Sequence, residues 1–246
     1  MKNPEDALTN LAGKVVTVTG GSRGIGKEMS MAFARCGAHV VIASRKLENC
    51  EALSSEITEK TGNKALPVAC HVGEWNQCDV LVDAVYEEFG RCDVLVNNAG
   101  MSPLYSSLTE VTQELFDKVM NVNLRGPFRL SALFGERMAN RGTGSIINVS
   151  SVAAAQPSPH EVPYGAAKAG LHSFTKSFAR AYAPHVRVNC IMPGPFLTDI
   201  SDAWSDQTLD SLKQLPLGRG GQPEEIVGAA LYFASDLSRS VTGEIH

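Results

Sequence analysis

The sequence has no long hydrophobic run, no block of basic residues and no closely spaced pair of cysteines. No apolar stretch approaches the roughly 20 residues that a helix needs to span a bilayer, and the polar start of the chain lacks the apolar centre of a secretory signal. The formal net charge is −4, and lysines and arginines are scattered. We therefore expect neither a membrane nor a nucleic acid as a partner.

The six cysteines lie far apart and form no CxxC motif, and no histidine spacing near them suggests a metal site. Such a distribution is typical of free thiols in a reducing compartment. The sequence therefore predicts a cytoplasmic globular protein with no bound metal.

Short apolar runs alternate with longer amphipathic stretches from residue 14 onward. The apolar runs predict strands that are covered on both faces, because they lack the strict alternation of a half-exposed sheet. The amphipathic stretches between them predict helices. The expected strands are 15–19, 39–43, 65–69, 94–96, 145–149 and 186–191, and the expected helices are Gly24–Cys36, Lys46–Thr61, Glu74–Phe89, Glu114–Arg141 and Val162–Ala183.

This alternation predicts an α/β fold with one doubly wound parallel sheet of about seven strands, flanked by helices on both faces. The length suits a single domain, and no linker interrupts residues 1–246. Residues 243–246 resemble the beginning of a last strand that is cut short. The segment at about 195–221 leaves a strand at its carboxyl end, where such sheets bind ligands, so we expect it to form a small substrate lid.

A glycine-rich loop joins the first expected strand to the first expected helix. Its glycines suit a tight turn, a close approach of the backbone to a pyrophosphate and close packing of helix on strand. The helix N-terminus that follows offers free N–H groups to phosphates. Although any such turn can be glycine-rich, its position predicts a Rossmann-type domain that binds a dinucleotide. The expected contacts in this loop are Gly20, Ser22, Arg23, Gly24, Ile25 and Gly26.

The residues after the second expected strand indicate which dinucleotide binds. An NAD site has Asp or Glu there to hold the ribose 2′-hydroxyl, whereas this chain has Ser44 and Arg45. A guanidinium can pair with a 2′-phosphate, and Arg23 provides a second cation within reach. We therefore predict NADP, as NADPH, over the alternative that Arg45 is only a surface residue.

Tyr164 and Lys168 lie four residues apart in an expected helix and therefore on one face of it. A lysine beside a tyrosine favours the phenolate and lowers the pKa of the hydroxyl, which is about 10 in isolation. Such a pair can transfer a proton. Taken alone, it is more often part of an ordinary helix face.

The chain contains six motifs that resemble, in type and in order along the chain, those of the classical short-chain dehydrogenase/reductase (SDR) family. The resemblance covers nearly the whole chain. The family's glycine loop is similar to residues 19–26, its Asn-Asn-Ala-Gly motif to residues 97–100, and its Pro-Gly and threonine motif to residues 193–198. Its serine usually stands thirteen residues before the tyrosine, which favours Ser151 over Ser150. The family's short Asp-Gly-Gly tail, which supports a subunit interface, has no counterpart here.

The resemblance implies a catalytic set of Asn123, Ser151, Tyr164 and Lys168. Negative charge develops on a carbonyl oxygen during hydride transfer, and Ser151 and Tyr164 would bind that oxygen. Tyr164 would donate the proton in reduction, Lys168 would hold the nicotinamide ribose, and Asn123 would hold a water of a proton relay. Taken singly, Ser151 could merely end a strand, and Asn123 could merely bond backbone groups.

The other expected cofactor contacts lie at the carboxyl ends of the remaining strands. His71 and Val72 stand where family members commonly have an Asp that touches the adenine, so their backbone groups or the imidazole would have to serve. Beyond the glycine loop, Ser44 and Arg45, the expected contacts are His71, Val72, Asn98, Ala99, Gly100, Tyr164, Lys168, Pro193, Gly194, Phe196 and Thr198.

We therefore predict an NADP(H)-dependent oxidoreductase that interconverts a carbonyl and a secondary alcohol on a small molecule, acting as a homodimer or homotetramer. A 3-oxoacyl-[acyl-carrier-protein] reductase remains an alternative, with Arg125, Arg129 and Arg137 as cations for an acidic carrier. A nucleotide-responsive binding or regulatory protein on the same fold is a second alternative. The residues expected near the substrate are Met101, Ala153, His160, Glu161, Val162, Pro163, Pro195 and Phe196.

Overall fold

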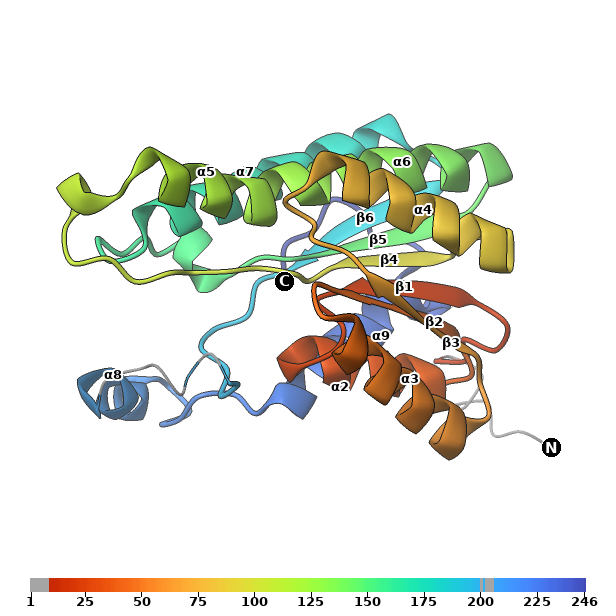
Figure 1. Cartoon of the computed structure of the whole chain (residues 1–246), viewed down its shortest axis with the longest axis horizontal. Helices are drawn as coiled ribbons and strands as arrows, with labels where there is room; N and C mark the ends of the chain where they lie inside the picture. Colours follow the sequence, from red (N-terminus) through yellow and green to blue (C-terminus); the bar gives the residue numbers. More distant parts are fainter. Residues whose placement is uncertain (1–8, 200, 202–205) are drawn as a thin grey trace.

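The computed structural model describes residues 9–199, 201 and 206–246, and these residues form a parallel sheet between two layers of helices (Figure 1). The sheet order is β3-β2-β1-β4-β5-β6, which confirms the predicted doubly wound α/β fold. Part of the predicted lid, residues 200 and 202–205, lies outside the described residues. The strands are β1 (Val15–Thr19), β2 (His39–Ser44), β3 (Ala65–Ala69), β4 (Val94–Asn97), β5 (Gly144–Val149) and β6 (Val186–Ile191).

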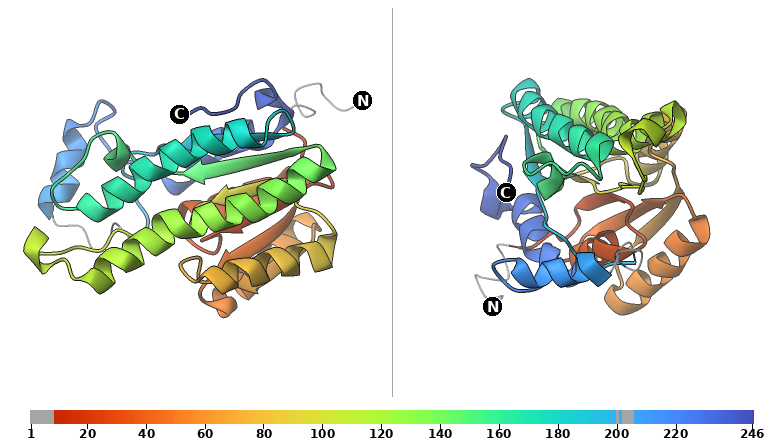
Figure 2. Two further views of the ribbon diagram at one scale, coloured as in Figure 1. Left: turned by 90° about the horizontal axis from the view of Figure 1, so that it is seen from above. Right: turned by 90° about the vertical axis from the view of Figure 1, so that its left-hand side faces the viewer.

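Two groups of helices cover the sheet, with α2, α3 and α9 on one face and α4 to α7 on the other (Figures 1 and 2). In the described part of the chain, no helix is long and apolar enough to cross a membrane. The helices are α2 (Gly24–Arg35), α3 (Leu47–Thr61), α4 (Trp75–Phe89), α5 (Gln113–Met120), α6 (Gly126–Arg141), α7 (Val162–Ala181), α8 (Asp206–Ser211) and α9 (Val227–Ala234).

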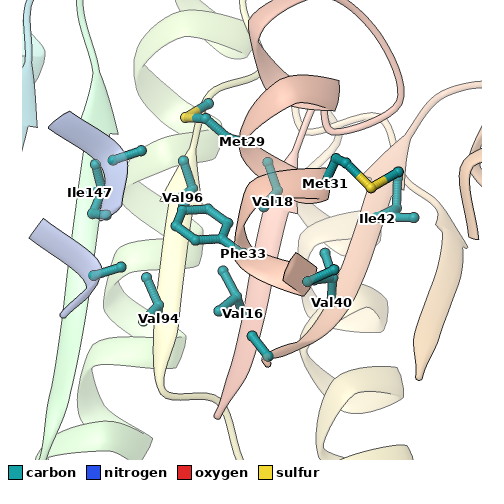
Figure 3. Close-up of a cluster of buried hydrophobic side chains, with 14 of the residues drawn as sticks. Val16, Val18, Met29, Met31, Phe33, Val40, Ile42, Val94, Val96 and Ile147 are labelled. Carbon is teal, nitrogen blue, oxygen red and sulfur yellow. The ribbon is translucent and has the colours of Figure 1, made fainter. Parts of the chain in front are cut away.

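Both faces of the central strands are buried, which explains why their sequences are apolar throughout. Val16 and Val18 of β1 belong to the cluster under α2, where Phe33 is fully buried (Figure 3). Val15 of the same strand belongs to the second cluster, on the face that α4 and α6 cover, together with Leu130. The core therefore consists of two apolar layers separated by the sheet.

The long helix predicted over residues 114–141 contains one irregular turn. Asn121–Arg125 form a π-helical turn between α5 and α6. The Nδ2 of Asn123 donates to the carbonyl of Val119 at 2.9 Å, so a side chain satisfies a backbone group there. Because π turns are rare and frequently lie at functional sites, this one marks Asn123 for attention.

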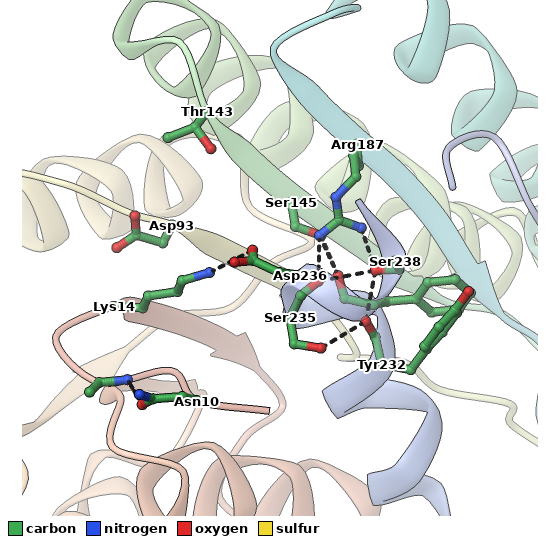
Figure 4. A network of polar contacts seen from close by, with 12 residues as sticks. Asn10, Lys14, Asp93, Thr143, Ser145, Arg187, Tyr232, Ser235, Asp236 and Ser238 are labelled. Atoms are coloured by element: carbon green, nitrogen blue, oxygen red, sulfur yellow. Dashed lines mark hydrogen bonds and ion pairs between the residues drawn. The ribbon is translucent and has the colours of Figure 1, made fainter. Parts of the chain in front are cut away.

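The last residues lie along the free edge of β6. Ile245 forms a parallel bridge with Cys190, and the backbone N–H of Met192 donates to the carbonyl of His246 at 2.6 Å. The segment predicted as a last strand therefore does extend the six-stranded sheet. Arg187 of β6 holds the residues that precede this last segment. It donates to Ser238 Oγ at 2.7 Å and to the carbonyl of Phe233 at 2.9 Å (Figure 4).

The strand order reverses between β1 and β4, and the loops after these two strands are bonded to each other. Thr19 Oγ1 donates to the carbonyl of Val96 at 3.2 Å and accepts from the backbone N–H of Ala99 at 3.1 Å. Asn98 Nδ2 donates to the carbonyls of Thr19 at 2.9 Å and Gly20 at 3.1 Å. The glycine-rich loop is thus fixed against the Asn-Asn-Ala-Gly loop at the switch point, where doubly wound sheets bind ligands.

Gly26 in the first turn of α2 makes this arrangement possible. A Cβ at this position would lie 2.6 Å from Asn98 Nδ2 and closer still to the carbonyl oxygen of Gly20. Both neighbours belong to the bonded loops, so neither can move aside without breaking that contact. Only glycine lets α2 begin this close to the sheet.

We expect Gly26→Ala to lower the free energy of unfolding by about 3 kcal/mol, because the added methyl group forces the two loops apart. Gly228→Ala is the matched control. Gly228 lies exposed in α9 with no atom within 4 Å of the place that an added methyl group would take, so alanine should raise stability by about 0.5 kcal/mol. Urea unfolding followed by circular dichroism measures both changes. Equal effects of the two substitutions would contradict this role of Gly26.

Candidate active site

The predicted catalytic serine and tyrosine meet at the carboxyl end of β5. Tyr164 lies in the first turn of α7, and its hydroxyl is hydrogen-bonded to Ser151. Ser150 is buried and donates instead to the carbonyl of Lys168 at 3.2 Å, so it supports the backbone of α7. The structure therefore favours Ser151 over Ser150, as the spacing to the tyrosine predicted.

The electrostatic surroundings of Tyr164 differ from the expectation. Burial raises the pKa of the Tyr164 hydroxyl; the hydrogen bond with Ser151 lowers it, and the negative charge of Glu161 raises it again. The net effect is a raised pKa, and Lys168 is not among its causes, so the expected lowering was wrong. Lys168 Nζ lies 5.6 Å from the centroid of the tyrosine ring. Tyr164 therefore keeps its proton, which is the form that a proton donor needs.

Lys168 is a buried ammonium group, with 3% of its surface exposed. Its Nζ donates to the carbonyl of Val149 at 2.8 Å, and burial lowers the pKa of Lys168 to about 8. A charged group in such a place is costly, because water solvates an ammonium far better than the protein interior does. The structure therefore excludes the ordinary alternative, in which Lys168 is a surface lysine beside a tyrosine.

Asn123 and Gly100 complete the surroundings of Lys168. A Cβ on Gly100 would lie 3.0 Å from Asn123 Oδ1 and 3.5 Å from Lys168 Nζ, so the three residues are contiguous. Asn123 is fully buried; its Nδ2 donates to the carbonyl of Met101 at 2.8 Å, and its Oδ1 accepts from the N–H of Met101 at 3.2 Å. Its side chain thus bonds backbone groups, and its place in a proton relay stays a prediction.

The glycine-rich loop and the end of β2 also lie together, as predicted. Ser22 Oγ donates to Ser44 Oγ at 2.9 Å, and the neighbouring Arg45 is exposed. No side chain caps the N-terminus of α2, and its first turn contains no acidic residue. Such an end has N–H groups and a partial positive charge available for an anion. These residues therefore fit the phosphates of a dinucleotide.

The segment after β6 passes over the glycine-rich loop. Thr198 Cγ2 would lie 3.4 Å from a Cβ on Gly24, and the guanidinium of Arg23 is paired with the carboxylate of Asp199. Just before them, Phe196 pairs with Gly221 in a parallel bridge. The start and end of the predicted lid are therefore joined to each other, and its start also contacts the glycine-rich loop. Pro193 lies beside the serine, because its carbonyl accepts from the N–H of Val152 at 3.0 Å.

The residues predicted for the adenine are bonded within the loop after β3. The N–H of His71 donates to Gln77 Oε1 at 2.7 Å, and His71 Nδ1 accepts from the N–H of Gly73 at 3.1 Å. The carbonyl of Val72 accepts from the thiol of Cys78 at 3.3 Å. These bonds give the loop a defined shape, while its contact with an adenine stays a prediction. Among the described residues, no cluster suited to a metal ion occurs.

A small hollow beside Tyr164 is the candidate substrate pocket. Its wall includes the predicted Glu161 and Pro163 and also Tyr105, which the sequence analysis did not identify. Tyr105 lies in a loop whose sequence has no periodicity. Its aromatic side chain is the one signal that could have pointed to it. The residues that line the hollow are Pro103, Tyr105, Leu115, Val119, Glu161, Pro163 and Tyr164.

Comparisons with known proteins agree with this geometry. A family model described as short chain dehydrogenase matches residues 14–209. The chain is 37% identical over 237 residues to a 3-oxoacyl-[acyl-carrier-protein] reductase of Thermotoga maritima, covering 96% of each protein. It superimposes on an NADPH-dependent 3-quinuclidinone reductase from Rhodotorula rubra with a TM-score of 0.94 and 31% identity, covering 100% of this chain and 93% of the other.

A gluconate 5-dehydrogenase from Burkholderia cenocepacia in complex with NADP and tartrate gives a TM-score of 0.93 at 31% identity, covering 98% of this chain and 96% of the other. Both the sequence relatives and the solved structures therefore match nearly the full chain. With the bonded Ser151 and Tyr164 and the buried Lys168 in place, the chain is an oxidoreductase that belongs to the classical short-chain dehydrogenase/reductase family.

Proposed function

We propose that the protein is an NADP(H)-dependent carbonyl reductase that interconverts a ketone or aldehyde and the corresponding alcohol. The observation that carries the proposal is the hydrogen-bonded pair of Ser151 and Tyr164 beside the buried ammonium of Lys168. A protein that only binds a nucleotide gains nothing from a costly buried charge next to a protonated tyrosine. The catalytic reading is therefore preferred to the regulatory one.

In this proposal the two hydroxyls act on one oxygen atom of the substrate. When bound, the nicotinamide supplies the hydride. Ser151 and Tyr164 hydrogen-bond the carbonyl oxygen as negative charge develops on it, and Tyr164 transfers its proton to that oxygen. The raised pKa of Tyr164 keeps its hydroxyl protonated, which is the form needed in the direction of reduction. Lys168 holds the ribose hydroxyls near this pair, and Asn123 keeps the backbone of Met101 in place at the side of the pocket.

Several features support NADP rather than NAD. The end of β2 has Ser44 and Arg45 in place of a carboxylate, and the solved relatives described above include one named as NADPH-dependent and one in complex with NADP. Arg45 is exposed beside the glycine-rich loop, whereas Arg23 is already paired with Asp199. We therefore assign recognition of the 2′-phosphate mainly to Arg45.

A carrier-protein thioester is supported less well as the substrate, although one relative has that name. The three arginines considered for docking an acidic carrier are each engaged by α4 or the loop before it. Arg125 donates to the carbonyl of Gly73 at 2.6 Å, Arg129 pairs with Asp79 at 2.6 Å, and Arg137 pairs with Asp83 at 2.9 Å. Each guanidinium is thus held by a partner within the protein, and Arg129 and Arg137 are each paired with a carboxylate. A small-molecule ketone is therefore the preferred substrate.

We also propose that the chain acts in a reducing compartment such as the cytoplasm, which the six free cysteines support. We expect it to form a homodimer or homotetramer through α6 and α7, which lie side by side (Figure 2). Phe128 of α6 is 38% exposed and packs 5.5 Å from Phe174 and 5.7 Å from Phe178 of α7, ring centre to ring centre. Such an exposed aromatic group suits an interface. Light scattering at micromolar concentration should show an oligomer, and a monomer would contradict the proposal.

We expect NADPH to bind at least about 30-fold more tightly than NADH, because a guanidinium pairs with the 2′-phosphate. Arg45→Ala should weaken NADPH binding about tenfold and leave NADH binding unchanged. Arg35→Ala, which removes the same charge from an exposed site at the end of α2, is the matched control and should change neither. Fluorescence titration measures the affinities of the parent and of both variants for NADPH and NADH. Equal affinities of the parent for the two cofactors would refute the preference.

We expect Tyr164→Phe to lower carbonyl-dependent NADPH oxidation by about 1,000-fold while NADPH affinity changes less than about threefold, since only the donated proton is lost. Tyr232→Phe, which removes a hydroxyl from α9 instead, should retain full activity. The measurement is NADPH absorbance with a panel of ketones, acyl thioesters and sugars. Full turnover by Tyr164→Phe would exclude its role as donor. If the parent binds NADPH but turns over no member of the panel, the regulatory alternative is favoured.

A further inference from the structure

Glu161 is one of the residues that line the candidate substrate pocket. It immediately precedes α7, three residues before Tyr164, and its side chain is half-buried. The pocket wall is otherwise formed by apolar residues and the two tyrosines, so Glu161 is the one charged group among the described lining residues. The carboxylate is close enough to the proton donor to raise the pKa of Tyr164, so its charge also acts on a substrate bound there.

The charge of Glu161 has little compensation within the protein. Ser102 hydrogen-bonds the carboxylate, but in the described part of the chain no lysine or arginine forms an ion pair with it. Burial raises the pKa of Glu161. The adjacent His160 attracts the carboxylate and so lowers that pKa, but it is exposed, where water weakens this attraction. A half-buried negative charge with one hydroxyl partner is stabilised further by any cation that enters the pocket.

Tyr105 holds the Glu161 segment in place. Its hydroxyl donates to the carbonyl of Pro159 at 2.9 Å and accepts from the backbone N–H of Val162 at 2.8 Å. These two bonds anchor the chain on either side of His160 and Glu161. The backbone of Glu161 therefore cannot move away from the pocket unless both bonds break, and the point from which its side chain extends is a built feature of the site.

We propose that Glu161 is a specificity-determining residue that selects ketones bearing a positive charge, such as a protonated or quaternary amine. This inference rests on the proposed carbonyl reductase function and assigns the substrate class of the same site. A cationic ketone pairs with the carboxylate while its carbonyl oxygen reaches Ser151 and Tyr164. A neutral ketone of the same shape gains no such pairing, and an anionic one is repelled.

Two ketones of nearly identical shape test this selection. The 1,1-dimethyl-4-oxopiperidinium cation and 4,4-dimethylcyclohexanone differ in having N⁺ or carbon at the ring position opposite the carbonyl. The positive charge by itself makes a carbonyl more reactive, so the quantity compared is how the ratio of the two kcat/KM values changes on substitution. We expect Glu161→Gln to lower the ratio of cation to neutral ketone about tenfold, mainly by loss of activity on the cation.

Glu114→Gln is the matched control, because Glu114 is an exposed acid on α5 next to the lining residue Leu115. It removes the same charge from outside the pocket and should leave the ratio within about twofold of the parent value. Tyr105→Phe is a second, independent variant. It keeps the carboxylate but removes its backbone anchor, so we expect the ratio to fall about threefold.

The outcomes separate this inference from the proposed function. An unchanged ratio in Glu161→Gln overturns the role of Glu161 while reduction of both ketones upholds the carbonyl reductase function. Reduction of other ketones of the panel but of neither test ketone also overturns the selection for cations. If Glu161→Gln does not fold, an unchanged ratio in Tyr105→Phe overturns it. Turnover of no carbonyl compound at all refutes the proposed function itself, and the inference with it.

Discussion

The close approach of α2 to the ends of β1 and β4 is the constraint on which the site depends. Gly26 has no side chain, so the helix can begin against the carbonyl of Gly20 and the amide of Asn98. That contact joins the glycine-rich loop to the Asn-Asn-Ala-Gly loop at the point where the strand order reverses. Through Gly100 the second loop reaches Asn123 and Lys168, so one packing contact aligns both halves of the site.

The proton-transfer half of the site depends on a single helix. α7 holds Tyr164 and Lys168 one turn apart, and buries the ammonium where its pKa falls to about 8. This arrangement costs folding free energy, because the interior solvates charge poorly. The carbonyl of Val149 offsets part of that cost, and Tyr105 fixes the entry to the helix. The buried charge of Lys168 thus lowers the stability of the fold at the place where the proposed chemistry needs that charge, as is common at functional sites.

Most secondary structure elements could be predicted because their signals are local. Apolar runs marked all six strands, and the helix over residues 162–181 was predicted only two residues too long at its end. The π turn at Asn121–Arg125 had no such signal, since it arises from contacts of Asn123 with Met101 and Val119. The pKa of Tyr164 was also mispredicted, because burial is a property of the folded chain and not of the Tyr-Lys spacing.

The sequence by itself determined the sheet, the nucleotide loop and the pairing of Tyr164 with Lys168, because these follow from periodicity, glycine positions and spacing along one helix. Only the tertiary structure distinguished Ser151 from Ser150 by contact and joined Tyr105 to the start of α7. Only the tertiary structure, too, showed that Arg125, Arg129 and Arg137 are bonded to α4 or to the loop before α4, and that Glu161 lines the pocket. These contacts join residues far apart in the chain, and no local pattern encodes which side chains will meet across two packed elements.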